Sequence, residues 1–168
     1  MELSEVKRPK LEDEHKDAIT FTKRDVEDVL APHNDVVAVI ANITDFNVHR
    51  IFIDNESLVD ILYFSIFIQI GFTLNQLGRF DIPIQDFSED SMILEGMIRL
   101  PVTIGTASKW MTIQVNFLVV KLSLVYNAIL NCPSLWTVKA IMSSYHLMVK
   151  FPTPNRVGQI RGNQAIAR

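Results

Sequence analysis

Short apolar runs separated by polar turns recur along the chain from residue 19 onward, and this pattern predicts a mainly β protein. Two runs at 36–43 and 48–53 flank the polar turn 44–47 and predict a β-hairpin. Later runs predict strands at 79–87, 92–104, 110–120, 125–130, 141–151 and 157–160, the last two closing the sheet. Pro83 and Pro101 lie inside two of these runs and predict edges, bends or breaks there.

Two segments predict short helices. The apolar segment 58–72 is too long for one strand and contains Gly71, a residue typical of helix ends, so we expect a short buried helix. Its Phe and Ile content would equally suit a strand. Pro133 precedes the sequence SLWTVKA, and its fixed backbone angle suits the first turn of a second helix.

The two ends of the chain differ from the rest. Between Glu2 and Asp17, ten of sixteen residues are Asp, Glu, Lys or Arg, which leaves too little apolar surface to favour folding. We therefore expect a disordered charged leader at 1–18, one domain at 19–161 and a frayed tail at 162–168. A solvated charged helix is the alternative for the leader, although Pro9 would interrupt it.

Composition excludes several classes of partner. The formal net charge is -3 and the pI about 5.8, so the chain lacks the basic field needed to bind nucleic acid directly. The longest apolar stretch falls short of the roughly 20 residues of a membrane-spanning helix, and the leader does not resemble a secretory signal. The single cysteine, Cys132, can form no internal disulfide. These features predict an intracellular, cytoplasmic location.

The candidate chemistry lies where the second strand ends. That strand, VHRIFI, becomes wholly apolar before Asp54, so the carboxylate starts out partly desolvated. The sequence IFIDNES and the later YNAILNCP resemble two motifs of retropepsin-like aspartic proteases: an Asp-(Thr/Ser/Asn)-Gly-(Ser/Ala) loop and a strand ending in Ile-Leu-Gly. Further segments, among them VDILYFSIFIQIGF, LEGMIRLPVTIGTA and YHLMVKFPTPNRVGQIRGNQAIAR, resemble the protease region of plant gypsy-type LTR retrotransposon gag-pol polyproteins.

This resemblance covers roughly residues 19–168 and implies a fold and a mechanism. The implied fold is a closed antiparallel β-barrel of the retropepsin type with one or two short helices. The implied reaction is peptide hydrolysis by two aspartates that share one proton, with no metal or cofactor. The chain has one such loop, so the resemblance implies a homodimer with Asp54 from each copy, acting on a polypeptide substrate. The chain itself resembles an excised piece of a polyprotein.

The loop departs from the family motif. Asn55 matches the position that bridges the two loops, and Ser57 matches the residue that hydrogen-bonds the carboxylate. Glu56 replaces the family glycine; a positive φ there would cost on the order of 1 kcal/mol, and its charge would oppose that of the aspartates. Asn131 replaces the glycine of Ile-Leu-Gly, and Leu58 replaces a small residue. These departures predict an inactive or weakened enzyme.

Two other functions remain open. The barrel could be a non-catalytic remnant that serves as a peptide-binding or dimerisation module. It could also be an unrelated small β-barrel that binds peptides or ubiquitin-like partners.

The resemblance also implies a flap, which is a hairpin that closes over bound peptide. The candidates are Phe87, Ser88, Glu89, Asp90 and Ser91, and a plain exposed turn is the alternative.

Other reactive side chains favour structural roles. Asp60 is more typical of a partner for a helix N-terminus than of a second catalytic carboxylate. His33, His49 and His146 are scattered without a neighbouring nucleophile, and Cys132 fits a small buried apolar side chain. Trp110, Trp136 and the phenylalanines are expected in the core or in a dimer interface.

Overall fold

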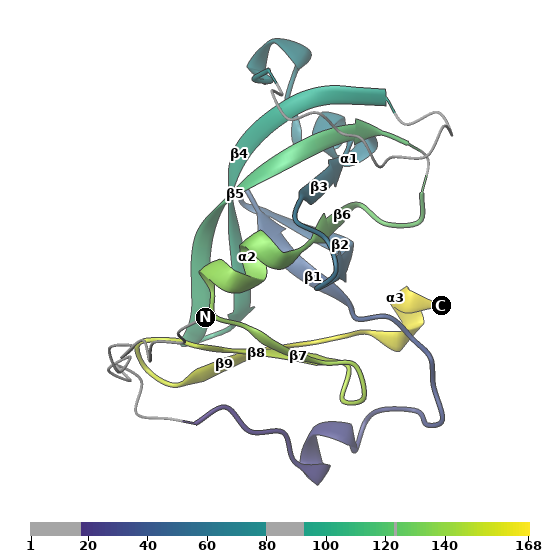
Figure 1. The fold of residues 1–168 in the computed structure, drawn as a ribbon, viewed down its shortest axis with the longest axis vertical. Coiled ribbons are helices and arrows are strands. Elements are labelled where there is room, and N and C mark those ends of the chain that lie inside the picture. The colour runs from purple at the N-terminus through teal and green to yellow at the C-terminus, as the bar shows by residue number, and fades with distance from the viewer. Residues whose placement is uncertain (1–17, 80–92, 123) are drawn as a thin grey trace, which may run out of the picture.

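A computed structural model describes residues 18–79, 93–122 and 124–168 of the chain (Figure 1). The leader at 1–17, nearly all of the strand expected at 79–87 and the flap candidates Phe87, Ser88, Glu89, Asp90 and Ser91 lie outside the described residues. The described strands are β1 (Ala38–Ile43), β2 (Phe46–Ile53), β3 (Asp60–Tyr63), β4 (Ile93–Thr106), β5 (Lys109–Lys121), β6 (Ala128–Leu130), β7 (Ile141–Ser143), β8 (Met148–Pro152) and β9 (Val157–Arg161). The described helices are η1 (Lys23–Val26), α1 (Phe64–Ile70), η2 (Leu74–Gln76), α2 (Cys132–Thr137) and α3 (Gln164–Ala167).

Six strands close into a barrel in the order β1-β2-β6-β3-β5-β4, which confirms the expected mainly β barrel. The barrel is mixed rather than wholly antiparallel, because β2 pairs with β6 and β3 pairs with β5 in parallel. Runs of apolar residues look alike in parallel and antiparallel strands when both faces are buried, so the sequence pattern could not reveal these directions.

Local signals fixed the first hairpin and the helix ends. The β1–β2 turn places Thr44 at φ 48° and Asp45 at φ 67°, two successive left-handed residues that match the right-handed twist of a tight hairpin. α1 ends at Gly71 with φ 109°, as expected of a helix C-terminus. The helix is shorter than the apolar segment 58–72, because its first part forms β3, a strand buried along its whole length.

Pro101 does not break its strand. β4 runs unbroken through it and pairs with β5 along its length. The Pro101 carbonyl accepts a hydrogen bond from the Thr44 backbone N–H at 3.1 Å, beyond the last paired residue of β1. The backbone nitrogen of Pro101, which carries no hydrogen, therefore faces the side of β4 where the ladder with β1 has already ended, so no ladder hydrogen bond is lost.

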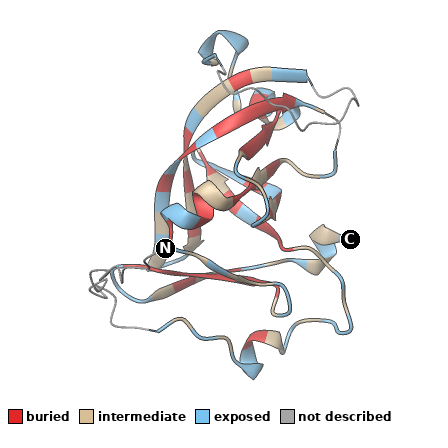
Figure 2. Cartoon of the chain, in the orientation of Figure 1, coloured by how far each residue is buried: buried red, intermediate tan, exposed pale blue. Residues whose placement is uncertain are grey.

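The last three strands form a sheet of their own. We expected residues 141–151 and 157–160 to close the main sheet, but β7, β8 and β9 pair only with one another, and β8 lies in the middle. Buried residues of this sheet, including Val149, Phe151 and Ile160, belong to the same apolar core as the barrel strands (Figure 2). A Cβ on Gly105 of β4 would lie 3.1 Å from the Phe151 ring, so the two sheets are in close contact.

The tail at 162–168 is not frayed, contrary to the sequence expectation. Its residues form α3, whose N-cap Asn163 accepts hydrogen bonds from the backbone of Ala165 and Ile166. The Gly162 N–H donates to the Leu147 carbonyl at 2.6 Å. The second contact joins the tail to the residue before β8, which a pattern of local residues could not predict.

The two tryptophans are not core residues. Trp110 is 56% exposed and Trp136 is 69% exposed, whereas Phe67, Phe117 and Phe151 are fully buried.

Among the described residues, no helix is long and apolar enough to span a membrane.

The shared core has a measurable consequence. Phe151→Ala should lower the free energy of unfolding by about 3–5 kcal/mol, because a fully buried aromatic ring leaves a cavity between the two sheets. Thermal unfolding followed by far-UV circular dichroism and by tryptophan fluorescence should show one coincident transition at a lower Tm. Two separate transitions would contradict a single core.

Candidate active site

Asp54 lies directly after β2, at the edge of the barrel where two parallel strands end. β2 pairs with β6 through Ile53 and Leu130, and parallel neighbours end at the same edge of a sheet. The Asp54 N–H continues this ladder by donating to the Leu130 carbonyl at 3.0 Å. The structure thus brings the two sequence motifs, IFIDNES and YNAILNCP, side by side.

The Asp54 loop turns back on its own carboxylate. The backbone N–H of Glu56 donates to Asp54 Oδ1 at 3.0 Å, and the Asp54 side chain is half-buried. The described structure shows no hydrogen bond from Ser57, the residue matched to that role in the sequence, to this carboxylate. Asn55 and Glu56 are exposed at the tip of the loop.

The expected strain at Glu56 is absent. The non-glycine residues with positive φ in the described chain include Arg50 and Ser108 but not Glu56. The loop therefore accepts a side chain at this position without the left-handed backbone that we expected, so backbone strain at Glu56 does not impair the site. The charge of Glu56, two residues from Asp54, remains.

Asn131 also differs from the expectation. Its φ is -110°, an extended conformation, so no left-handed residue is needed here either. The side chain is 1% exposed, and Nδ2 donates to the Val59 carbonyl at 2.5 Å. Among the described residues, no donor reaches its buried Oδ1. Replacing glycine with Asn131 therefore adds a buried side chain whose polar atoms need hydrogen-bond partners. It does not place a strained backbone angle at this position.

Cys132 fastens the loop to α2. Its N–H donates to the Ser57 carbonyl at 3.1 Å, and its Sγ donates to the Asn55 carbonyl at 3.0 Å. The thiol is half-buried and hydrogen-bonded, not the buried apolar side chain that the sequence indicated. Sequence reasoning missed this role, because nothing in the local pattern links residues 55 and 132.

Asp60 is a buried carboxylate that supports the site. It lies at the start of β3, only 3% exposed, and accepts hydrogen bonds from the Asn131 N–H at 2.6 Å and the Ser134 hydroxyl at 2.8 Å. It therefore holds the start of α2 through the N-cap residue and a first-turn side chain, whereas the sequence pointed to the helix that follows Asp60 in the chain. Burial raises the pKa of Asp60 above its usual value, and the two hydrogen bonds oppose that rise.

A row of apolar side chains crosses the barrel next to Asp54. The strand registers place Phe52 beside Ile129, Ile129 beside Ile61, Ile61 beside Leu118, and Leu118 beside Met97. Ile61 and Leu118 belong to a small apolar cluster separate from the main core, and Ile129 and Met97 pack against it. Phe52, two residues before Asp54, stacks on Tyr126 with ring centroids 5.2 Å apart.

The remaining candidates lie elsewhere. His33 contacts the Tyr145 carbonyl at 3.2 Å, His146 contacts the Ser143 hydroxyl at 2.6 Å, and His49 is exposed on β2. The structure brings none of them to Asp54. In the described part of the chain, no group of three or more His, Cys, Asp or Glu side chains could hold a metal ion.

Comparison with known proteins identifies the fold. The sequence matches no protein-family model and no curated protein. The structure is similar to the retroviral protease-like domain of Ddi1 from Leishmania major, with a TM-score of 0.59 and 14% identity over 78% of this chain and 96% of that chain. It also aligns with a retropepsin-like aspartic protease from Rickettsia conorii, with a TM-score of 0.47 and 14% identity over 73% of this chain and 80% of that chain. The chain has the retropepsin-like aspartic protease fold.

The buried carboxylate gives a test of the support behind the loop. Asp60→Ala should be less stable than Asp60→Asn by about 1–3 kcal/mol, because alanine leaves the Asn131 N–H and the Ser134 hydroxyl without an acceptor. Chemical denaturation at several pH values measures both variants.

The same experiment tests the sign of the pKa change. A carboxyl with a raised pKa contributes stability that is fully present below its unfolded pKa of 3.8 and is lost as the pH rises through the folded value. Asp60→Asn should therefore gain stability relative to the native chain as the pH rises from acid to neutral. A difference that stays constant with pH would exclude the raised pKa.

Proposed function

We propose that this chain is an aspartic endopeptidase domain that acts as a homodimer, with Asp54 of each copy forming the catalytic pair. Its resemblance in sequence to plant gypsy-type elements suggests that it processed a retrotransposon polyprotein. One observation supports the proposal most strongly. Asp54 directly follows β2 at the end of a retropepsin-like barrel, and its carboxylate accepts a hydrogen bond from the Glu56 N–H.

The chemistry follows from two facing carboxylates. Two like charges a few ångströms apart cannot both ionise readily, so a pair holds one proton between them. The ionised aspartate removes a proton from a water molecule, and the protonated one donates a hydrogen bond to the peptide carbonyl as water attacks. The chain contains one Asp-Asn-Glu-Ser loop, so the second carboxylate has to come from a second copy.

Exposed apolar side chains near the loop support dimerisation. Leu58, in the loop, and Trp136, on α2, are each 69% exposed, and Leu58 lines a shared hollow with Thr137, the neighbour of Trp136. β7 follows α2 at the edge of its sheet and carries the exposed Ile141. Exposed apolar side chains are costly to leave in water. A second copy of the chain could cover Leu58, Trp136 and Ile141 with the same face of its own surface.

The apolar row beside Asp54 supports a preference for apolar substrates. Phe52 and Ile129 are half-buried and lie next to each other on β2 and β6. A peptide bound across Asp54 would place its side chains against this row, so we propose cleavage next to large apolar residues.

A non-catalytic dimerisation module is the second candidate. The exposed Glu56 carboxylate, two residues from Asp54, favours it, because an added negative charge opposes the single charge that a working pair carries. The buried Asn131 Oδ1, which accepts no hydrogen bond from the residues that the structure describes, also points to a site no longer maintained for turnover.

Peptide cleavage separates the two candidates. The purified chain is incubated with peptides of apolar sequence at acidic and neutral pH, alongside Asp54→Asn, Glu56→Gly and Glu56→Gln. We expect cleavage by the native chain at acidic pH, its loss in Asp54→Asn, and faster cleavage in both Glu56 variants because both remove the opposing charge. No cleavage by the native chain or by either Glu56 variant would favour the non-catalytic module.

The dimer interface is tested with a matched pair of tryptophans. Trp136→Ser should weaken self-association in sedimentation equilibrium, since Trp136 lies next to the proposed interface. Trp110→Ser removes an equally large exposed side chain next to the β4–β5 turn and should leave association unchanged. A native chain that stays monomeric at high concentration would rule out the dimer.

A further inference from the structure

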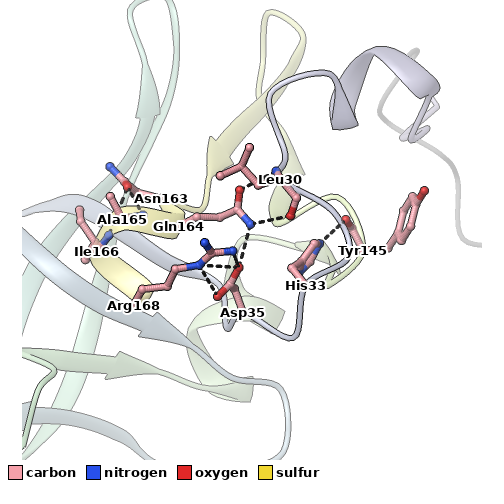
Figure 3. Close-up of polar contacts among 9 residues, drawn as sticks. All are labelled: Leu30, His33, Asp35, Tyr145, Asn163, Gln164, Ala165, Ile166 and Arg168. Carbon is pink, nitrogen blue, oxygen red and sulfur yellow. Dashed lines mark hydrogen bonds and ion pairs between the residues drawn. The ribbon is translucent and has the colours of Figure 1, made fainter.

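The C-terminal helix and the N-terminal segment are joined by one polar cluster (Figure 3). Arg168 donates to the Asp35 carboxylate from Nε at 3.1 Å and from a terminal guanidinium nitrogen at 2.9 Å. Gln164 Nε2 donates to the same carboxylate at 2.7 Å. Gln164 also accepts from the Leu30 N–H at 2.8 Å and donates to the Leu30 carbonyl at 3.1 Å.

The cluster lies two residues from a backbone hydrogen bond that reaches the candidate site. The Val37 carbonyl accepts from the Ile53 N–H at 2.9 Å, and Ile53 is the residue before Asp54. The next carbonyl, that of Ala38, accepts from the Asn163 N–H at 2.8 Å. Carbonyls of adjacent residues in an extended strand point to opposite edges, so the start of β1 is held between β2 on one side and α3 on the other.

The segment before β1 is held by its contacts with the C-terminal part of the chain. α3 contacts both β1 and β2, and Val37 is buried beside Gly162. Residues 32–37 before β1 lack regular secondary structure, so Asp35 is fixed by side-chain contacts and not by a strand ladder, whereas Val37 is also fixed by its burial in the core. A bidentate guanidinium–carboxylate contact fixes both distance and orientation, which a single ion pair does not.

We propose that Arg168 and Asp35 are positioning residues for Asp54: their ion pair holds the start of β1 against the end of β2 and so keeps the Asp54 loop in place. The catalytic meaning of this inference rests on the proposed function, but the mechanical coupling does not.

The ion pair persists in the acidic range in which a shared-proton pair would work. The Arg168 guanidinium and the Gln164 amide lower the pKa of Asp35, with a smaller effect from the nearby His33. A carboxyl with a lowered pKa contributes stability that is present above its unfolded pKa of 3.8 and is lost as the pH falls through the folded value. The ion pair between Arg168 and Asp35, which we call the clamp, therefore remains formed at mildly acidic pH.

Amide hydrogen exchange of the full chain, measured by NMR, tests the coupling directly. Arg168→Ala should speed exchange of the Ile53 amide about tenfold, since a charged hydrogen-bond pair that supports it is lost. Amides in the middle of the β4–β5 hairpin should keep their native rates. Arg168→Lys, which preserves the charge, should restore part of the protection, and Asp35→Asn should reproduce the alanine effect. The carboxyl carbon shift of Asp54 should change in Arg168→Ala and Asp35→Asn.

The chain offers a matched control in a second contact between the same two segments. Arg161 and Asp28 are 3.9 Å apart and the Asp28 side chain is 88% exposed, so this pair is weak and Arg161→Ala should leave the Ile53 amide and the Asp54 carboxyl signal unchanged. Equal acceleration of all barrel amides in Arg168→Ala, or an unchanged Ile53 rate, would overturn the proposal.

This measurement does not depend on peptide cleavage. A chain that never cleaves peptides but shows the local effect would disprove the proposed function alone, and a cleaving chain without the effect would disprove the clamp alone.

Discussion

The parallel pairing of β2 with β6 is the contact on which the candidate site depends. It places Ile53 beside Leu130, so that the residues following both strands, Asp54 and Asn131, emerge at the same edge of the barrel. A slip of one residue in this register would turn every side chain of the strand to the opposite face. The apolar residues of β2 and β6 that face the core therefore determine where the carboxylate lies, although they take no part in chemistry.

A polar network behind the loop completes this arrangement within an apolar core. Asp60, Asn131 and Ser134 are all buried, and the hydrogen bonds that Asp60 accepts join the start of β3 to the start of α2. A buried carboxylate is costly, but removing an acceptor from two buried donors is costly as well. Cys132 adds a second link, from α2 to the loop itself. The loop is thus held from behind at several points, which suits a site that has to present one carboxylate in a fixed orientation.

The structure changes the reason for which activity could be impaired. The departures from the family motif at positions 56 and 131 had suggested backbone strain, yet neither residue adopts a positive φ. The remaining cause at Glu56 is its negative charge beside Asp54. The remaining cause at Asn131 is a buried Oδ1 that accepts no hydrogen bond from the described residues. This distinction matters because a charge can be removed by a substitution such as Glu56→Gln without changing the backbone of the loop.

The sequence alone determined the features that depend on neighbouring residues. The hairpin turn at Thr44, the helix end at Gly71 and the opening of α2 at Pro133 follow from local steric preferences, and the apolar strand before Asp54 marked the candidate site. Only the tertiary structure decided the parallel strand directions, the separate β7–β9 sheet, the hydrogen bonds from the start of α2 to Asp60 and the ion pair between Asp35 and Arg168. The partners in the parallel strand pairs, in the contact between Asp60 and α2 and in the ion pair between Asp35 and Arg168 are tens to more than a hundred residues apart. An apolar run or a lone charge carries no information about which distant segment it will meet.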